Sequence, residues 1–184
     1  PGKLGVWSIR WFTTKTEVEL CGHGTLAAAH ALFDEGLVTA GSEITFSSNS
    51  GKLVVRKAEK NRLSMDFPLL KARASSVSPA LVEGLGAYPD EVYAGDHFLC
   101  VFEEEERIHE LKPDFQALSG FNSFVGVIVT ARTSRVGYHF ISRYFAPGIG
   151  IDEDHATGSA HCLLAPYWAK KLGKSKLIGH QVSP

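Results

Sequence analysis

Few cysteines and no long apolar run occur in this sequence, and each shortage excludes a class of protein. The 184 residues contain three cysteines, Cys21, Cys100 and Cys162. Such a sparse and odd count argues against a disulfide scaffold and is typical of a reducing compartment, so we expect a cytoplasmic protein. No apolar stretch approaches the ~20 residues that span a bilayer, and no signal peptide is recognisable, so we expect no membrane partner.

Neither sign of charge dominates. The sequence has 19 basic and 20 acidic residues, for a formal net charge of −1, whereas a nucleic-acid-binding protein needs a basic surplus. We therefore expect no nucleic-acid partner. The longest charged run, residues 103–106, is all glutamate and is interpreted as a solvated turn between strands. A hydrophobic content of 44% supplies enough apolar side chains for the core of one large or two small soluble domains.

Most of the chain is typical of short strands bounded by Gly, Asn, Ser or Pro. These strands are predicted at residues 6–12, 43–47, 52–57, 62–66, 97–102, 125–131 and 138–145.

Helices are fewer. Two longer ones are predicted at residues 25–35 and 159–172, the first followed by Gly36 and the second by Gly173 as C-terminal caps. Shorter helices are predicted at 78–85, which Ser78 and Pro79 would begin, and at 114–118. Because the helix at 25–35 is small and apolar nearly all round, we expect it to be enclosed, and Pro166 predicts a kink in the other long helix.

Two stretches repeat the same order of residues. Residues 10–12 read Arg-Trp-Phe and precede the CGHGT segment, residues 21–25. Residues 143–145 read Arg-Tyr-Phe and precede the DHATGS segment, residues 154–159. A duplicated strand-to-helix unit explains the pattern, and a chance recurrence of common aromatic strands and Gly-Ser caps is the alternative. Duplication predicts two similar domains, residues 1–70 and 71–184, whose helix N-termini meet across a cleft.

The beginning of a helix can bind an anion. Its first N–H groups have no intrahelical acceptor, and the helix dipole adds positive potential there. Gly22, Gly24 and Gly158 leave this backbone accessible, and Thr157 and Ser159 add hydroxyl groups. These five residues are therefore predicted to bind a small carboxylate.

The titratable groups of the two segments are candidates for proton transfer. His23 lies between two glycines, and a histidine can exchange a proton at neutral pH while an acid facing it does the reverse. The acidic run 152–154 has a simpler interpretation, in which its negative charges only interact favourably with the positive end of the helix dipole. The remaining histidines outside the segments are interpreted as structural: His30, His97, His109, His139 and His180.

Cys21 invites two further interpretations. A thiol at a helix N-terminus has a lowered pKa and could act as a nucleophile or base, although the repeat has His155 at this position and so offers no symmetric pair of thiols. The other interpretation is a metal site made of Cys21, His23, His155 and His161. No CxxC or HExxH motif supports it, and we expect no metal.

The stretches RWFTTKTEVELCGHGTLAAAHALF and SRYFAPGIGIDEDHATGSAH resemble the two signature segments of the phenazine biosynthesis PhzF-like proteins. That family has the diaminopimelate epimerase-like fold, shared with proline racemases. The resemblance implies an α+β fold of two pseudo-symmetric β-barrel domains, each around a central α-helix, with the active site in the cleft between them. It further implies cofactor-independent acid–base isomerisation of a small carboxylate such as trans-2,3-dihydro-3-hydroxyanthranilate, in a homodimer.

The resemblance also implies roles for individual residues. The histidine of the family's Cys-Gly-His motif falls on His23, and the acidic residue of its Asp-Pro-Val-Thr-Gly-Ser-Ala-His motif falls on Asp154. The substrate-binding glycine and serine fall on Gly158 and Ser159. This chain has His-Ala in place of Pro-Val, which changes the shape or charge of the second segment. Only one cysteine matches the pair that racemases use, which argues against two-base racemisation by thiols.

Two parts of the family pattern do not occur in this sequence. One is an N-terminal segment with an Asn-x-Ser-Glu-Thr-Ala motif, whose glutamate the resemblance implies to be the main base. The other is an Arg-Gly-Gly strand region beyond the C-terminal residues. We therefore expect open barrel edges. Two hypotheses follow: an isomerase with His23 and Asp154 in its site, or a catalytically incomplete fragment that binds a small anion or a protein partner.

Overall fold

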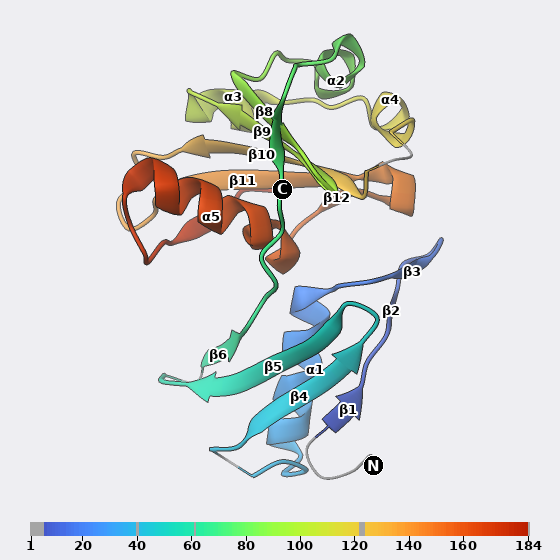
Figure 1. Cartoon of the computed structure of the whole chain (residues 1–184), viewed down its shortest axis with the longest axis vertical. Helices are drawn as coiled ribbons and strands as arrows, with labels where there is room; N and C mark the ends of the chain where they lie inside the picture. Colours follow the sequence, from blue (N-terminus) through green and yellow to red (C-terminus); the bar gives the residue numbers. More distant parts are fainter. Residues whose placement is uncertain (1–5, 40, 61, 122–123, 184) are drawn as a thin grey trace. The chain divides into compact units, whose positions relative to one another are not determined.

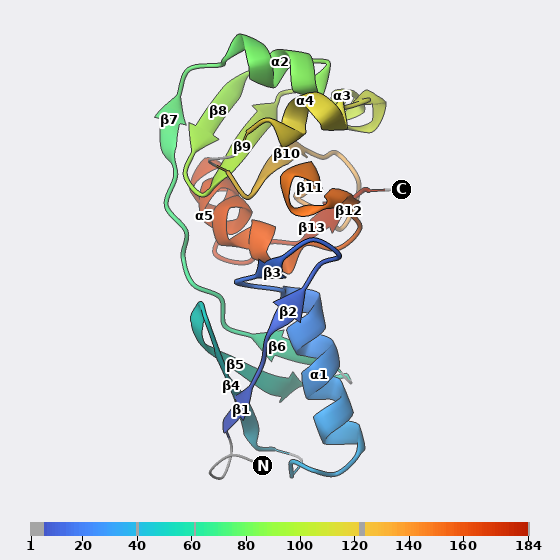
Figure 2. The same cartoon turned by 90° about the vertical axis from the view of Figure 1, so that its right-hand side faces the viewer.

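The computed structural model describes residues 6–39, 41–60, 62–121 and 124–183. The chain divides into two compact units, Pro1–Pro68 and Leu69–Pro184. Figure 1 and, from a second side, Figure 2 show the first unit with a sheet and the helix α1, and the second unit with its own sheet and several helices. Among the described residues, no helix has the length and apolar character needed to cross a membrane.

The first unit is an open sheet with a helix, α1 (Gly22–Asp34), packed on it. The sheet order is β1-β4-β5-β6, with β1 parallel to β4 and the other pairs antiparallel. Alternate residues of the strands point to the helix and form the core, among them Ile44, Phe46, Leu53 and Val55. A separate hairpin of β2 and β3 lies beside them. The strands are β1 (Val6–Ser8), β2 (Trp11–Phe12), β3 (Glu17–Val18), β4 (Glu43–Ser48), β5 (Gly51–Ala58) and β6 (Arg62–Met65).

Two predictions for this unit are wrong. The single strand predicted at 6–12 is split into β1 and β2. The helix at 25–35 is not enclosed within the described residues, because the sheet covers only the side that carries Thr25, Ala29 and Phe33, while Ala27 and Ala31 remain exposed. The helix also begins earlier, at Gly22.

The second unit is a mixed sheet with helices on both faces (Figure 1). The sheet order is β12-β11-β10-β9-β8-β7, with β13 also paired to β11. The β9–β10 and β11–β13 pairs are parallel and the others are antiparallel. The strands are β7 (Arg73–Ser75), β8 (Glu91–Ala94), β9 (His97–Phe102), β10 (Gly126–Arg132), β11 (Phe140–Ala146), β12 (Ile151–Asp154) and β13 (Gly179–Gln181).

Helix α5 (His161–Leu172) covers one face of this sheet, and α2 (Pro79–Leu85), α3 (Glu105–Glu110) and α4 (Phe115–Ser119) cover the other. Leu99 and Val101 point to the α5 side, while Cys100 and Phe102 point to the opposite side. Because both faces are covered, β9 and β11 are buried along their whole length, unlike a strand with one solvated face.

Local start and stop signals predicted the helices of this unit well, with one exception. The Ser78 hydroxyl accepts a hydrogen bond from Leu81 N at 3.2 Å, and Pro79 begins α2 as predicted. The glutamate run 103–106 was predicted to be a solvated turn, and this is wrong at its end because α3 begins at Glu105. The burial of Ile108 in the core stabilises this helix, and acidic side chains are favourable in a first turn.

The α+β class is confirmed, but neither sheet closes into a barrel among the described residues. Strands β1 and β6 form the edges of the first sheet, and β7 and β12 are the ends of the second. The predicted β-barrels are therefore open sheets here, each with its long helix on one side. The strands that the sequence did not predict are β3, β7, β8, β12 and β13.

An ion pair extends the repeat seen in the sequence. Arg143 donates through Nε and Nη2 to the two carboxylate oxygens of Glu153, at 2.7 and 2.8 Å. Arg10 donates in the same way to Glu17, at 2.8 and 2.7 Å. In both units the glutamate is the strand partner of the Phe in the Arg-aromatic-Phe stretch. A shared register and a shared forked ion pair favour duplication over chance.

The two ion pairs differ in burial, and this difference predicts their contributions to stability. The Arg143 side chain is 9% exposed and also donates to the carbonyls of Ile108 and Leu111, whereas the Arg10 side chain is 61% exposed. Arg143→Met leaves a buried carboxylate and two carbonyls without their donor, so we expect a loss of ~3–5 kcal/mol in the free energy of unfolding. Arg10→Met should change it little. Urea denaturation of both variants measures this, and equal losses would contradict the argument.

The acid range provides a second test. Burial opposes ionisation of Glu153, but the hydrogen bonds and charge of Arg143 outweigh it and hold the pKa of this carboxyl below its ordinary value. Stability from this group is present above the unfolded pKa of about 4.3 and disappears as the pH falls through the lower folded value. The unfolding free energy of the wild type relative to Glu153→Gln should therefore decrease as the pH is lowered from about 5. A pH-independent difference would contradict this prediction.

Candidate functional site

The CGHGT segment forms the first turn of α1. Cys21 is the N-cap residue, in extended backbone conformation with φ −135° and ψ 104°. Its carbonyl oxygen accepts hydrogen bonds from both Thr25 N, at 3.1 Å, and Thr25 Oγ1, at 2.7 Å. The Cys21 Sγ lies 3.5 Å from Nε2 of His23, whose side chain is exposed. The two side chains that the sequence marked as candidates for chemistry, the Cys21 thiol and the His23 imidazole, are therefore adjacent. The imidazole is accessible to solvent.

The glycines of this segment permit close packing. A Cβ on Gly24 would lie 3.1 Å from Cys21 Sγ and 3.2 Å from Trp11 Cδ1, which is tighter than an ordinary contact. Gly22 is buried as the first residue of the helix. Gly24 therefore lets the first turn approach the indole of the Arg-Trp-Phe strand. The binding role predicted for both glycines stays a prediction.

In the second unit, strand pairing brings two distant residues together. Strands β12 and β13 both pair with β11, β12 along its second half and β13 along its first. The last residue of β12, Asp154, pairs with Tyr144, and the last residue of β13, Gln181, pairs with Ser142, two positions away on β11. The ends of the two strands therefore meet beside β11, where the DHATGS segment begins.

A closed hydrogen-bond network holds this segment. Gln181 Oε1 accepts from Thr157 N at 2.7 Å, and Gln181 Nε2 donates to Thr157 Oγ1 at 3.2 Å and to the carbonyl of Asp154. Thr157 Oγ1 in turn donates to Asp154 Oδ2 at 2.7 Å. The Asp154 carboxylate is thus oriented by a buried threonine, and that threonine by a glutamine. Gln181 was missed in the sequence because it lies on a strand that was not predicted, far along the chain from Asp154.

The helix that follows begins as a 3₁₀ turn, Gly158–Ala160, before α5. Thr157, predicted to bind substrate, donates its N–H to Gln181 and its hydroxyl to Asp154, a geometry that favours a positioning role. Ser159 is different, because its hydroxyl has no hydrogen-bond partner among the described residues and its side chain is partly accessible. The first N–H groups of such a turn also have no partner within the helix.

Neutral groups lie behind Asp154. Tyr144, its strand partner, is buried, and Tyr144 Oη lies 3.2 Å from His97 Nδ1. Burial raises the pKa of Tyr144, and the charge of Asp154 raises it further. Burial lowers the pKa of His97 and, at the start of α5, of His161. At neutral pH Tyr144, His97 and His161 are therefore neutral.

The metal interpretation receives no support from the described part of the chain. No three His, Cys, Asp or Glu side chains in it come together in a geometry that could hold a metal ion.

Comparison with known families places the sequence clearly. The family described as Phenazine biosynthesis-like protein matches residues 2–183. The chain belongs to this family. It is 41% identical over 181 residues to an uncharacterized isomerase of Halalkalibacterium halodurans, covering 96% of this chain and 67% of the relative. It is 46% identical over 178 residues to an uncharacterized isomerase of Pseudomonas aeruginosa, covering 96% of this chain and 66% of the relative.

Solved structures show the same fold. A phenazine biosynthesis PhzF-family protein of Enterococcus faecalis superposes with a TM-score of 0.87 at 40% identity, covering 99% of this chain and 68% of that one. A hydroxyproline epimerase of Agrobacterium vitis reaches a TM-score of 0.56 at 9% identity, with 95% and 59% covered, which shows a shared fold alone. The diaminopimelate epimerase-like fold is therefore confirmed. The chain spans about two thirds of the length of the curated relatives it matches.

The network around Gln181 makes a testable prediction. Gln181→Leu keeps the approximate size of the side chain but leaves Thr157 N and the Asp154 carbonyl without partners, which costs ~1–3 kcal/mol of unfolding free energy. Amide exchange at Thr157 should accelerate. The matched control is Gln116→Leu on α4, where the side chain is exposed and we expect little change. Hydrogen–deuterium exchange and urea denaturation measure both, and unchanged exchange at Thr157 would contradict the network's role.

Proposed function

We propose that this chain forms part of a cofactor-independent isomerase that moves a proton between two positions of a small carboxylate. Membership of the family and the two relatives named as isomerases support the reaction class. The observation that carries the proposal is the orientation of the Asp154 carboxylate by Thr157 at the start of a helix. A positioned acid beside helix N–H groups suits both binding of an anion and proton transfer.

In the proposed site, the DHATGS segment binds the substrate carboxylate. The N–H groups of Gly158 and Ser159 and the Ser159 hydroxyl donate hydrogen bonds to its oxygens. Asp154 exchanges a proton with a substrate carbon. The Thr157–Gln181 network keeps this acid in place, and such fixed geometry is what general acid–base catalysis requires.

The CGHGT segment supplies a second proton-transfer group, His23. Its imidazole is exposed and lies beside the Cys21 thiol. Histidine side chains exchange protons near neutral pH. One group removes a proton from a substrate carbon, the double bond shifts, and a proton is delivered to another carbon, so the product has the same composition as the substrate and no redox partner is needed.

The proposal includes the substrate class and the setting of the protein. We take trans-2,3-dihydro-3-hydroxyanthranilate as the representative substrate, a small cyclic carboxylate. We further propose a homodimer in the cytoplasm, with no nucleic-acid or membrane partner, consistent with the balanced charge and the sparse cysteines.

Deuterium incorporation tests the reaction directly. In D₂O we expect the chain to exchange carbon-bound hydrogen of trans-2,3-dihydro-3-hydroxyanthranilate, followed by NMR. His23→Ala and Asp154→Asn should each slow this exchange ~10²–10⁴-fold, because loss of a general acid or base has effects of that size. His30→Ala, an exposed histidine further along α1, is the matched control and should leave the rate unchanged.

The double variant and the unmodified chain complete the experiment. Groups that act in one reaction are strongly non-additive, so His23→Ala with Asp154→Asn should lose about as much as the more damaging single change. No exchange by the folded wild-type chain, together with a higher melting temperature in phosphate or sulfate, would replace the isomerase proposal with the second hypothesis, a module that binds a small anion without turnover.

A further inference from the structure

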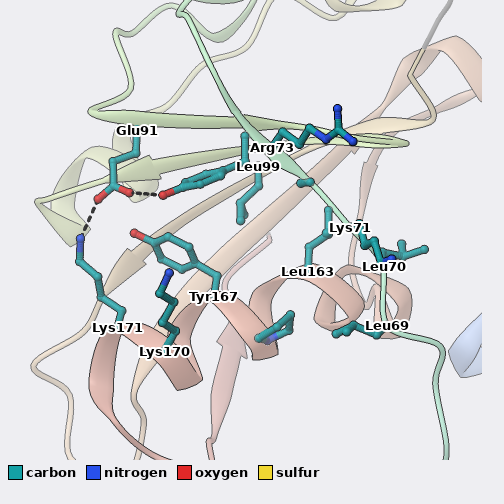
Figure 3. Close-up of a pocket in the computed structure, with 13 residues that line it drawn as sticks. Leu69, Leu70, Lys71, Arg73, Glu91, Leu99, Leu163, Tyr167, Lys170 and Lys171 are labelled. Atoms are coloured by element: carbon teal, nitrogen blue, oxygen red, sulfur yellow. Dashed lines mark hydrogen bonds and ion pairs between the residues drawn. The ribbon is translucent and has the colours of Figure 1, made fainter.

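A cavity of about 750 Å³ lies in the second unit. Figure 3 shows it between the 69–73 segment and the side of α5. None of the predicted site residues lines it, and the DHATGS segment does not contribute to it. Its volume is within the range of cavities that bind small organic molecules, roughly 300–1,000 Å³.

The inner wall of the cavity is apolar. Leu99 and Leu163, which are 2% and 4% exposed, belong to the core between the sheet and α5. Leu70 and Tyr93 pack against the same core and line the cavity as well. Pro166 adds a further apolar surface and brings no N–H group to the α5 wall. An apolar ligand body would therefore be removed from water against these residues.

The edge of the cavity is cationic. Four basic residues line it: Lys71, Arg73, Lys170 and Lys171. Glu91 is the acid of the lining, and Figure 3 shows its carboxylate occupied on both oxygens, by Lys171 Nζ at 2.7 Å and by Tyr93 Oη at 2.8 Å. The hydrogen bond from Lys171 holds the pKa of Glu91 below its ordinary value, so this acid stays ionised and paired.

Three of the cations are left without an acidic partner among the described residues, namely Lys71, Arg73 and Lys170. A further donor lies deeper in the wall. The Tyr167 hydroxyl is buried and interacts with the Glu91 carboxylate. Burial raises the pKa of Tyr167, so its hydroxyl keeps its proton and can donate. The local surplus of positive charge contrasts with the balanced charge of the whole chain.

We propose that this cavity binds an organic anion with an apolar body, specifically an aliphatic or aromatic carboxylate. The apolar wall takes the body, and the unpaired cations at the edge take the carboxylate. A neutral ligand of the same shape would bind more weakly because it lacks the charge interaction. A small anion without an apolar body would bind more weakly because it lacks the apolar contact. This site is separate from the proposed proton-transfer site, so it does not depend on that proposal.

The test uses two pairs of probes that differ only in charge. Isothermal titration calorimetry of the whole chain with 2-naphthoate and octanoate should show binding at one site, whereas 2-naphthamide and octanamide should bind at least about tenfold more weakly, a difference of ~1.4 kcal/mol. Acetate, which has the charge without the body, should show no measurable binding. Equal affinities for acid and amide would overturn the electrostatic part of the proposal, and no binding of either acid would overturn all of it.

Charge-reversal variants locate the site. Lys170→Glu and Arg73→Glu should each weaken 2-naphthoate binding about fivefold, the size of one partly exposed ion pair. Lys174→Glu is the matched control, because Lys174 is an exposed lysine just beyond α5 that does not line the cavity, and it should leave the affinity unchanged. Equal weakening by all three variants would show a diffuse field and overturn the assignment to this cavity.

A cavity-filling variant tests the apolar wall. Ala72→Trp places a large ring in the space without removing any charge, and 2-naphthoate binding should be lost while circular dichroism reports an intact fold. Binding retained by the folded variant would place the ligand elsewhere and contradict the proposal.

Discussion

The buried guanidinium of Arg143 is the constraint on which the arrangement of the second unit depends. It joins β11 to β12 through Glu153 and joins both to the carbonyls of Ile108 and Leu111, at the end of α3. Each of the three guanidinium nitrogens donates to at least one acceptor, and such pairing is the condition under which a buried charge is tolerated. Because Asp154 follows Glu153 directly, the backbone of the candidate acid cannot move far without breaking the two hydrogen bonds between Arg143 and Glu153.

The repeat in the first unit shows what burial adds. Arg10 and Glu17 have the same register and the same forked geometry, but the Arg10 side chain is 61% exposed and the Glu17 side chain 28% exposed. Water screens such a pair and competes for its hydrogen bonds. The same pattern of residues is therefore a strict positional constraint in one unit and a minor surface feature in the other.

The sequence predicted those parts of the fold that are determined locally. Ser78 and Pro79 mark a helix start whatever surrounds them, and long strands such as β9 and β10 carry a clear β-branched and aromatic signal. The short strands β12 and β13 have no such signal, because three or four residues show little periodicity and their conformation is set by pairing with β11. The helix α3 was missed for the opposite reason, since its glutamates suggested solvent while Ile108 belongs to the core.

The same distinction applies to the candidate site. Asp154, Gly158 and Ser159 could be named from sequence because they lie within six residues of one another and match a motif. Gln181 could not, because only the meeting of two strand ends beside β11 places its carboxamide on Thr157 and Asp154. The exposure of Ala27 and Ala31 on α1 was likewise invisible, because composition shows that a helix is apolar but not how many of its sides a sheet covers.

Under the two proposals, α5 contributes to two chemically different binding surfaces, its N-terminal turn and its flank. In the proposed proton-transfer site, its N-terminal turn presents backbone N–H groups near Asp154, and donors of this kind favour a compact polar anion. In the proposed cavity site, Leu163 and Pro166 on its flank contact the apolar body of the ligand. The long lysine side chains can reach a carboxylate at different positions. Both surfaces favour a carboxylate, but they differ in what accompanies it. The ligands of the two surfaces would therefore differ in size and apolar area rather than in charge.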